Sequence, residues 1–439
     1  MLIVKLAFRN ILRNRRRSLL TLLSMGGGFF LLCLTLSMSE GSYSNIINIF
    51  TQDHTGHVQV HKENYLERPS LYKTINHADE IITQLEQQPL VLGVAPRIYS
   101  PSLAYGKNKT FPAQVIGIDP DREAKTTRLE NKISEGHYLT KEVINQITRE
   151  VTNQVTREVT NQVTNLEGNQ ISTDGYFPAM IGFSLAKNLQ LTIGDELVLI
   201  SQGIDGSIAN DIFEVVAIVG DVGSYERMNV YIHLSAMREF LSMQGDTSKV
   251  HELAIILSSQ SEAREFAVNT QLALENKNLS VDPWQVVESS FYKSMQADKK
   301  GSYVSMGIII FIVSIGVLNT ILMGTLERTR EFGVLKAIGT RPVVVFTLIM
   351  LESFVLAIIS CLIGLALALP VCFWLAGVGI SMPEPIDMGG IIFDTMLGEV
   401  SWFVVLLPSI VVISSTLIVS FIPAIRAAKI SPLKALQAV

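Results

Sequence analysis

Four long apolar runs, interrupted by one short charged segment, constrain this chain more than any other feature. Residues 18–40, 301–326, 342–380 and 400–425 are each long enough to cross a hydrocarbon core of about 30 Å. The segment 327–341 lies between the second and third runs and mixes acidic and basic residues. Such charges are costly inside a bilayer, so we expect this segment to form a short helix at a membrane surface. The sequence predicts a membrane protein with four transmembrane helices.

Basic residues near the ends of the runs predict the orientation. They gather in residues 1–17, in the 327–341 segment and in the tail 426–439, whereas residues 381–399 contain no Lys or Arg. Both termini and the charged segment are therefore expected in the cytoplasm, and 381–399 becomes a periplasmic loop. Residues 1–17 read as an amphipathic helix on the inner leaflet, the alternative being a plain extension of the first span.

The middle of the chain, residues 41–300, then lies outside the membrane. Short β-type runs alternate there with short helical patterns, without a regular βαβ rhythm. The predicted strands are 58–60, 113–117, 197–201, 213–219, 230–232 and 253–257. This predicts a large extracytoplasmic α+β domain inserted between transmembrane helices 1 and 2. An eight-residue repeat, beginning NQITREVT, occupies 145–165. It is either a protrusion that touches a partner or a repeat expansion in a tolerant surface loop.

The chain carries no motif for chemistry of its own. It has no Gly-x-x-x-x-Gly-Lys-Ser/Thr phosphate loop, no His-Glu-x-x-His and no Gly-x-Ser-x-Gly, so we expect no catalysis and no bound cofactor. His54, His57 and His61 cluster, but no carboxylate or Cys completes a metal site at close spacing, and exposed strand histidines are expected instead. Basic residues concentrate beside the apolar runs, which argues against a nucleic-acid partner.

Three tracts resemble the FtsX/MacB-like, or type VII, ABC transporter permeases. They are NTILMGTLERTREFGVLKAIG at 319–339, PAIRAAKISPLKAL at 423–436 and LAFRNILRNRRRS at 6–18. Residues 182–194 also resemble the periplasmic core of that family. The resemblance implies a permease of the bacterial inner membrane that pairs with a second permease, identical or different, and with two cytoplasmic ATPase subunits that bind ATP and Mg²⁺.

In that family the short cytoplasmic segment is a coupling helix that docks into the ATPase. Here it would present charged residues around small apolar anchors, the alternative being a solvated hairpin. The expected ATPase-coupling residues are Glu327, Arg328, Arg330, Glu331, Phe332, Gly333, Leu335 and Lys336. ATP-driven closure would be transmitted through spans one and two to the outer domain.

The segment after the first span looks most like the lipoprotein-releasing branch, with Ser39, Glu40 and Tyr43 as client-facing residues. Lipoproteins or other lipid-linked clients are thus expected, together with contact to membrane lipid and to a periplasmic chaperone or carrier. MacB-like efflux of peptides, toxins or drugs is the alternative. A sensor or scaffold without transport is a further alternative from a different class.

Five residues inside the apolar runs are also singled out. Gly26, Gly27 and Gly28 allow a close helix approach, as at a dimer seam, or a flexible kink. Asn319 is grouped with them as a dimer or transmembrane residue. Glu352 lies inside the third run, where a carboxylate is functional or paired, or else protonated or turned toward the inner surface.

Overall fold

The computed structural model describes residues 15–140, 176–243, 248–274, 278–387 and 392–431. The amphipathic helix expected over the first residues and the repeat at 145–165 fall wholly or mostly outside this part. The chain divides into two compact units. The helical unit comprises residues 1–45, 293–383 and 394–439, and the sheet unit comprises 46–292 and 384–393. Each unit is described by itself.

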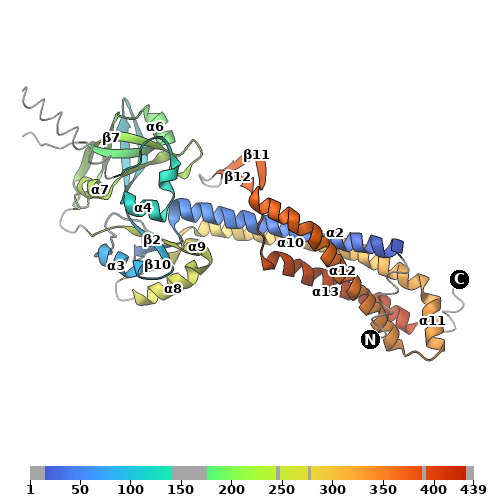
Figure 1. Ribbon diagram of the computed structural model, residues 1–439. Helices are drawn as coiled ribbons and strands as arrows, with labels where there is room; N and C mark the ends of the chain where they lie inside the picture. The colour runs from blue at the N-terminus through green and yellow to red at the C-terminus, as the bar shows by residue number, and fades with distance from the viewer. Residues whose placement is uncertain (1–14, 141–175, 244–247, 275–277, 388–391, 432–439) are drawn as a thin grey trace, which may run out of the picture. The chain divides into compact units, whose positions relative to one another are not determined.

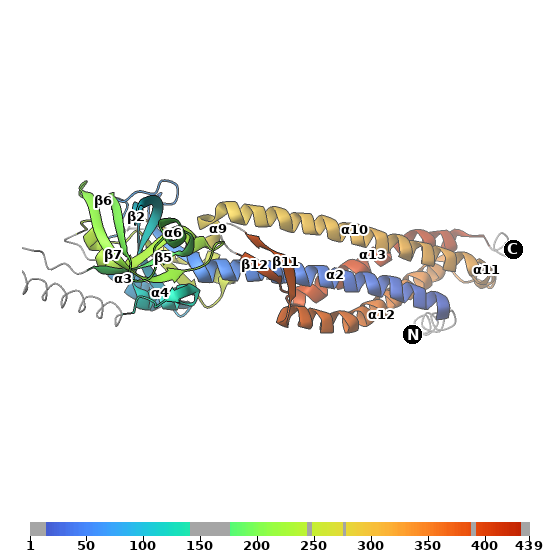
Figure 2. The ribbon, with the colours of Figure 1, turned by 90° about the horizontal axis from the view of Figure 1, so that it is seen from above.

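Long apolar helices make up the helical unit. They are α2 (Arg15–Phe50), α10 (Ser289–Glu327), α12 (Pro342–Gly377) and α13 (Trp402–Lys429), and they lie side by side in Figures 1 and 2. Within the described residues, these four are the helices long and apolar enough to cross a membrane. A short helix, α11 (Thr329–Ala337), separates α10 from α12.

Two of these helices are longer than the predicted spans. Helix α2 continues to Phe50 rather than ending near residue 40, and α10 begins at Ser289 rather than near 301. Contacts between the polar extensions explain the difference: Glu40 pairs with Lys299 at 2.7 Å, and the Tyr43 hydroxyl donates to Asp298 at 2.6 Å. The two extensions therefore stabilise each other through polar contacts and do not require a lipid environment.

The expected loop 381–399 contributes most of a two-stranded sheet. Strand β11 (Ile380–Asp387) pairs with β12 (Ile392–Met396). The residues that follow β12 attach to α2: the backbone N–H of Glu399 donates to the Ser37 carbonyl at 3.0 Å, and the Ser37 hydroxyl donates to the Glu399 carbonyl at 2.8 Å. This segment therefore contacts the first long helix rather than only linking α12 to α13.

A single sheet with two parts forms the sheet unit. Its order is β10-β1-β9-β2-β3-β8-β5-β7-β4, and β6 pairs with both β2 and β7. The strands β2, β3, β8, β5, β7 and β6 therefore close into a barrel, whereas β10, β1, β9 and β2 form an open layer. The strands are β1 (Val58–Lys62), β2 (Val91–Gly106), β3 (Lys109–Ile118), β4 (Ile133–Gly136), β5 (Phe177–Gly182), β6 (Glu196–Gln202), β7 (Ile208–Val219), β8 (Asn229–His233), β9 (Glu252–Leu257) and β10 (Leu279–Pro283).

The long strand β2 joins these two parts. Its first half pairs with β9 and its second half with β3 and β6. Short helices complete the unit: α3 (Ala78–Glu86), α4 (Pro120–Thr126), α6 (Phe183–Leu189), α7 (Leu234–Phe240), α8 (Ala263–Ala273) and α9 (Trp284–Val287). Strands and helices intermix as expected for an α+β domain.

Candidate functional site

The short helix α11 is the strongest candidate for a partner contact. It begins after Arg328, whose backbone is not helical, and it ends before Gly339, which has a φ of +100°. The N–H groups of Gly339 and Thr340 donate to the carbonyls of Lys336 and Leu335, which closes the last turn. Pro342 then starts α12. Local signals at both ends thus define a helix of nine residues.

One face of α11 is anchored by a buried ion pair. A guanidinium nitrogen of Arg328 lies 2.8 Å from a carboxylate oxygen of Glu352 in α12, and another lies 3.1 Å from Glu331. The Arg328 guanidinium also lies 5.1 Å from the ring centroid of Phe332. Arg328, Glu352 and Phe332 are all buried. Glu352 is therefore paired, which was one of the two readings expected for it.

A second anchor holds the other end of α11. The Lys336 ammonium donates to the carbonyls of Ala428 and Ile430 at 2.8 and 2.6 Å. These carbonyls lie at the C-terminal end of α13, where cations and side-chain donors are favourable. Together, Arg328 and Lys336 fix α11 to α12 and α13.

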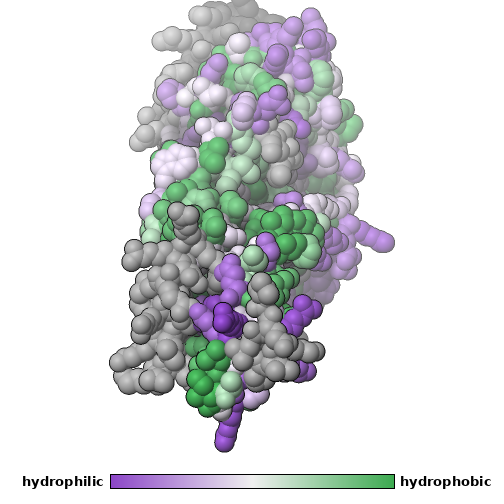
Figure 3. Space-filling view, turned by 90° about the vertical axis from the view of Figure 1, so that its right-hand side faces the viewer, coloured by the Kyte–Doolittle hydropathy of each residue, from purple (hydrophilic) through white to green (hydrophobic). Residues whose placement is uncertain are grey.

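The rest of the α11 surface is exposed. Arg330, Glu331, Val334, Leu335 and Ile338 are exposed, with exposed fractions of 42, 39 and 78% for the three apolar residues in that order. Hydrophobic and hydrophilic side chains adjoin one another in Figure 3, seen from the side on which α11 lies in Figure 1. We call these five residues the α11 outer face. An apolar centre with charged neighbours is typical of a protein-binding surface.

The structure thus divides the expected coupling residues into two groups. Glu327, Arg330, Glu331 and Leu335 are exposed, whereas Arg328, Phe332 and Gly333 are buried and Lys336 is half-buried. Phe332 was expected to be an apolar anchor for a partner, but it is only 1% exposed because it packs inward under Arg328. Val334 and Ile338 were not singled out, although their spacing from Arg330 by four and eight residues places them on one helical face.

The three glycines and Asn319, which were singled out in the apolar runs, have different surroundings in the structure. A side chain at Gly26 would meet the Ser360 carbonyl of α12 at 3.2 Å, and one at Gly28 would overlap Val313 of α10. Gly27 has open space around it. The glycines therefore permit close packing within this chain. Asn319 is exposed on α10.

The residues expected to face a client lie in the extension of α2. Tyr43 is buried, Ser39 and Glu40 are half-buried, and Tyr43 and Glu40 bond to α10 through Asp298 and Lys299. Their side chains are thus occupied by contacts within the helical unit.

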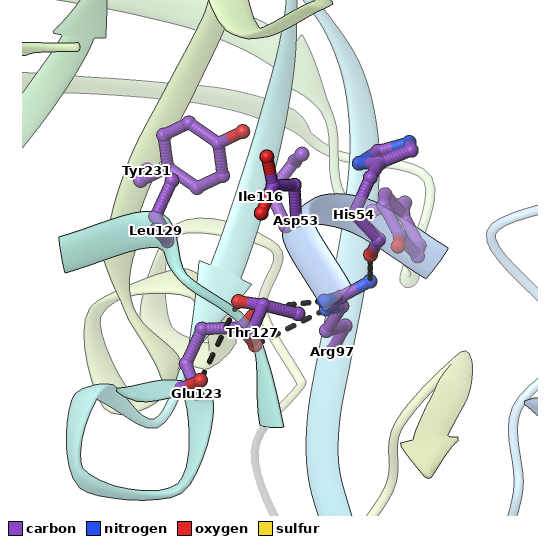
Figure 4. Close-up of a pocket in the computed structure, with 9 residues that line it drawn as sticks. Asp53, His54, Arg97, Ile116, Glu123, Thr127, Leu129 and Tyr231 are labelled. Atoms are coloured by element: carbon purple, nitrogen blue, oxygen red, sulfur yellow. Dashed lines mark hydrogen bonds and ion pairs between the residues drawn. The ribbon is translucent and has the colours of Figure 1, made fainter. Parts of the chain in front are cut away.

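A buried polar cluster lies in the sheet unit around Arg97 of β2 (Figure 4). Its guanidinium donates to Glu123 at 2.6 and 3.1 Å, to Glu252 at 3.0 Å and to the His54 carbonyl at 2.8 Å. His61 lies 3.3 Å from Glu252. Burial would raise the pKa of Glu252, but the hydrogen bond from His61 and the charge of Arg97 hold it below its usual range.

This cluster corrects the expectation of exposed strand histidines. His57 and His61 are 2% and 0% exposed because β1 lies between β9 and β10. A carboxylate does lie beside His61, but it comes from β9 and is distant in sequence. Within the described residues, no group of three or more His, Cys, Asp or Glu side chains could hold a metal ion.

Comparisons with known proteins match two families along the chain. The MacB-like periplasmic core domain family matches residues 18–273, and the FtsX-like permease C-terminal family matches 303–432. The lipoprotein-releasing system transmembrane protein LolE of Haemophilus influenzae is 21% identical over 83% of this chain and 82% of its own. LolC of Xylella fastidiosa, also named as a transmembrane protein of the lipoprotein-releasing system, is 22% identical over 80% of this chain and 78% of its own. The pyoverdine export ATP-binding/permease protein PvdT of Pseudomonas putida is 25% identical over 52% of this chain and 34% of its own.

Proposed function

The chain belongs to the FtsX/MacB-like, type VII family of ABC transporter permeases, and we propose that it couples ATP hydrolysis by a separate ATPase to the release of lipoproteins from the inner membrane. The observation that carries the coupling is the α11 outer face: an exposed apolar and charged surface on a helix whose other face is fixed. The ATPase would supply the ATP and Mg²⁺ sites, since the permease sequence has no phosphate loop.

The two anchors of α11 support a role in transmitting force. A helix held only by its chain connections to α10 and α12 would tilt when a partner pushes on it. The Arg328–Glu352 ion pair and the Lys336 contacts with the end of α13 connect α11 to two long helices instead. A displacement of the α11 outer face would therefore move α12 and α13 with it. On this proposal the termini and α11 lie in the cytoplasm.

Asn319 supports pairing with a second permease. Its side chain is exposed on an apolar helix and makes no hydrogen bond within the described residues. An amide facing lipid is unfavourable, whereas an amide between two membrane helices can form an interhelical hydrogen bond. We propose that α10 meets the second permease, identical or different, at this position.

The choice of lipoproteins rests on two relatives that cover about four fifths of the chain and are named for lipoprotein release. Contacts with membrane lipid and with a periplasmic carrier belong to the same proposal. Export of a small molecule or peptide is the second candidate, because one relative over half of the chain is named for pyoverdine export. Membership of a transporter family disfavours a sensor or scaffold without transport.

Co-purification of the ATPase tests the coupling. We expect Leu335→Asp and Ile338→Asp to reduce the amount of ATPase recovered with the detergent-extracted permease by about tenfold or more, because a charge would be buried at the interface. Ile208→Asp is the matched control, since Ile208 is 81% exposed in the sheet unit. Equal ATPase recovery with all three variants would refute docking at α11.

Reconstitution tests the client. Proteoliposomes that contain the permease, its ATPase and an acylated protein should release that protein when ATP is added, and the Ile338→Asp variant should not. If the assembled complex hydrolyses ATP but neither releases nor crosslinks to acylated protein, the lipoprotein proposal fails and export becomes the better candidate.

A further inference from the structure

A large cavity lies within the sheet unit, and its lining includes Arg97 but not Glu123. Its volume is about 540 Å³, within the range of small-molecule binding sites. Its wall draws on β1, β2, β3 and β9, on the residues just before β8 and on the segment that leads into α10. Its polar and charged lining residues include Tyr65, Arg97, Gln114, Tyr225, Glu252 and Glu288.

Several polar groups in the wall have no partner in the described part of the chain. The Tyr65 and Tyr225 hydroxyls, the Gln114 amide and the Glu288 carboxylate make no hydrogen bond or ion pair there. Other polar residues of the wall do bond internally: Gln59 donates to the Thr55 carbonyl at 2.9 Å. The unpartnered groups come from four separate segments and line one space, so a single ligand can satisfy all of them.

The charges of the wall determine which ligand fits. Arg97 is the one Arg or Lys side chain among the lining residues, and its guanidinium is already bonded to two carboxylates and a carbonyl. Glu252 takes up part of that charge and also contacts His61. Glu288 remains without a cation. Burial raises the pKa of Glu288, as is usual for a carboxylate that loses water without gaining a partner. The wall thus contains two carboxylates, Glu252 and Glu288, for the one guanidinium of Arg97, and this arrangement disfavours anions.

We propose that this cavity binds a small polar molecule that carries one ammonium group. The ammonium pairs with the Glu288 carboxylate, and hydroxyl groups of the ligand bond to Tyr65, Gln114 and Tyr225. A hydrocarbon chain does not fit this description, because it would leave these polar groups without partners. The site is therefore distinct from any site for the acyl chains of a lipoprotein and does not depend on the proposed function.

Two amines with neutral counterparts test the charge requirement. The probes are glucosamine with glucose, and 5-amino-1-pentanol with 1,5-pentanediol, titrated onto the full chain in detergent. We expect at least one amine to bind and to raise the unfolding midpoint, and its neutral counterpart to bind about tenfold more weakly, which corresponds to about 1.4 kcal/mol. Absence of binding by both amines up to about 10 mM would overturn the proposal.

Substitutions test the site. Glu288→Gln keeps the shape but removes the charge, so we expect it to weaken amine binding about tenfold and to leave the neutral counterpart unaffected. Glu265→Gln, at an exposed acidic residue of α8 in the same unit, is the matched control and should bind as the unaltered chain does. Gln114→Ala should weaken the binding of both the amine and its neutral counterpart. Amine binding that is unchanged in both Glu288→Gln and Gln114→Ala would place the ligand elsewhere and overturn the proposal.

Discussion

At the scale of single residues, Arg328 and Glu352 show how a carboxylate is accommodated inside an apolar helix. Their side chains are 9% and 10% exposed, and their charged atoms lie 2.8 Å apart. In a low-dielectric environment such a pair contributes little net stability, because desolvation offsets the attraction. Loss of one partner, however, leaves a buried charge without compensation. The pair therefore fixes the position of α11, because Arg328 must lie within reach of Glu352.

A double-mutant cycle tests this requirement. Arg328→Met and Glu352→Gln should each lower the free energy of unfolding by about 3 kcal/mol, whereas the double variant should lose less than the sum, because no buried charge is left unpaired. Thermal unfolding in detergent measures the effect. Arg330→Met is the matched control, since Arg330 is exposed two residues away and should change the stability by less than about 0.5 kcal/mol. Strictly additive losses would contradict the pairing.

His57 makes the stability of the sheet unit depend on pH. Its Nδ1 accepts the N–H of Leu257 at 3.0 Å, so this nitrogen must be unprotonated in the folded chain. Burial lowers the pKa of His57 from 6.5 to about 4. The unfolded chain thus binds a proton near pH 6.5 that the folded chain binds only near pH 4. Stability is therefore lost as the pH falls through this window, by about 2 kcal/mol at pH 5.

His57→Asn should remove that part of the pH dependence, because an amide oxygen can still accept from Leu257 but does not titrate. We expect the fall in unfolding midpoint between pH 7.5 and pH 5 to be smaller in His57→Asn than in the unaltered chain. The carboxylates contribute equally to both proteins, so the difference between them reports on His57. His137→Asn, at an exposed histidine, is the control. If the unfolding midpoint falls equally in His57→Asn and His137→Asn, the pH dependence does not come from His57.

At the scale of secondary-structure elements, close packing of α2 against α12 depends on paired glycines. A Cβ at Gly364 would lie 2.7 Å from the Gly26 carbonyl oxygen and equally close to the Phe29 ring. Both neighbours are buried, and a backbone carbonyl cannot move aside like a flexible side chain. The helices would therefore have to separate.

Gly364→Ala is thus expected to lower the free energy of unfolding by about 1–3 kcal/mol, as for overpacking elsewhere. Gly27→Ala is the matched control, because a Cβ there meets nothing within 4 Å. It should leave the stability unchanged or raise it slightly, since alanine favours a helix more than glycine does. Thermal unfolding of both variants in the same detergent provides the comparison. A tolerated Gly364→Ala would show that the helices are not held this closely.

The elements that sequence reasoning located correctly are those whose signal is local. The apolar runs and the strands near Val58, Phe213 and Leu253 stand out by composition alone. Strand β2 was missed, because Pro96 and Pro101 interrupt its pattern, although both lie in strand pairs. Prolines are unusual inside a sheet, so a local rule discounts the whole stretch.

The features that sequence reasoning missed depend on distant partners. Nothing near His61 indicates Glu252, and nothing near Arg328 indicates Glu352; each pair forms only when separate elements pack. The same holds for the inward orientation of Phe332. Its neighbours in sequence made it look like a surface anchor, but its burial is determined by the long helices behind α11.

At the scale of the whole molecule, the proposed function requires force to travel from α11 to the periplasmic domain. Helix α10 runs from Ser289 to Glu327, which directly precedes Arg328 and α11. The polar extensions of α2 and α10 are joined by the pairs Tyr43–Asp298 and Glu40–Lys299. We infer that these two helices, stiffened against each other, carry the displacement. Their continuity is then a mechanical requirement and not only a consequence of helix propensity.

A kink in the extension of α10 tests this inference. Ala297→Pro removes the hydrogen bond to the carbonyl four residues earlier and bends the helix, at a cost of about 3 kcal/mol. Ala297 is exposed, so the substitution should spare the packed core. We expect the complex to assemble and hydrolyse ATP, but client release per ATP in proteoliposomes to fall about tenfold relative to Ala297→Ser, which keeps the helix. Release that matches the serine variant, with hydrolysis intact, would mean that the force takes a route other than a straight α10.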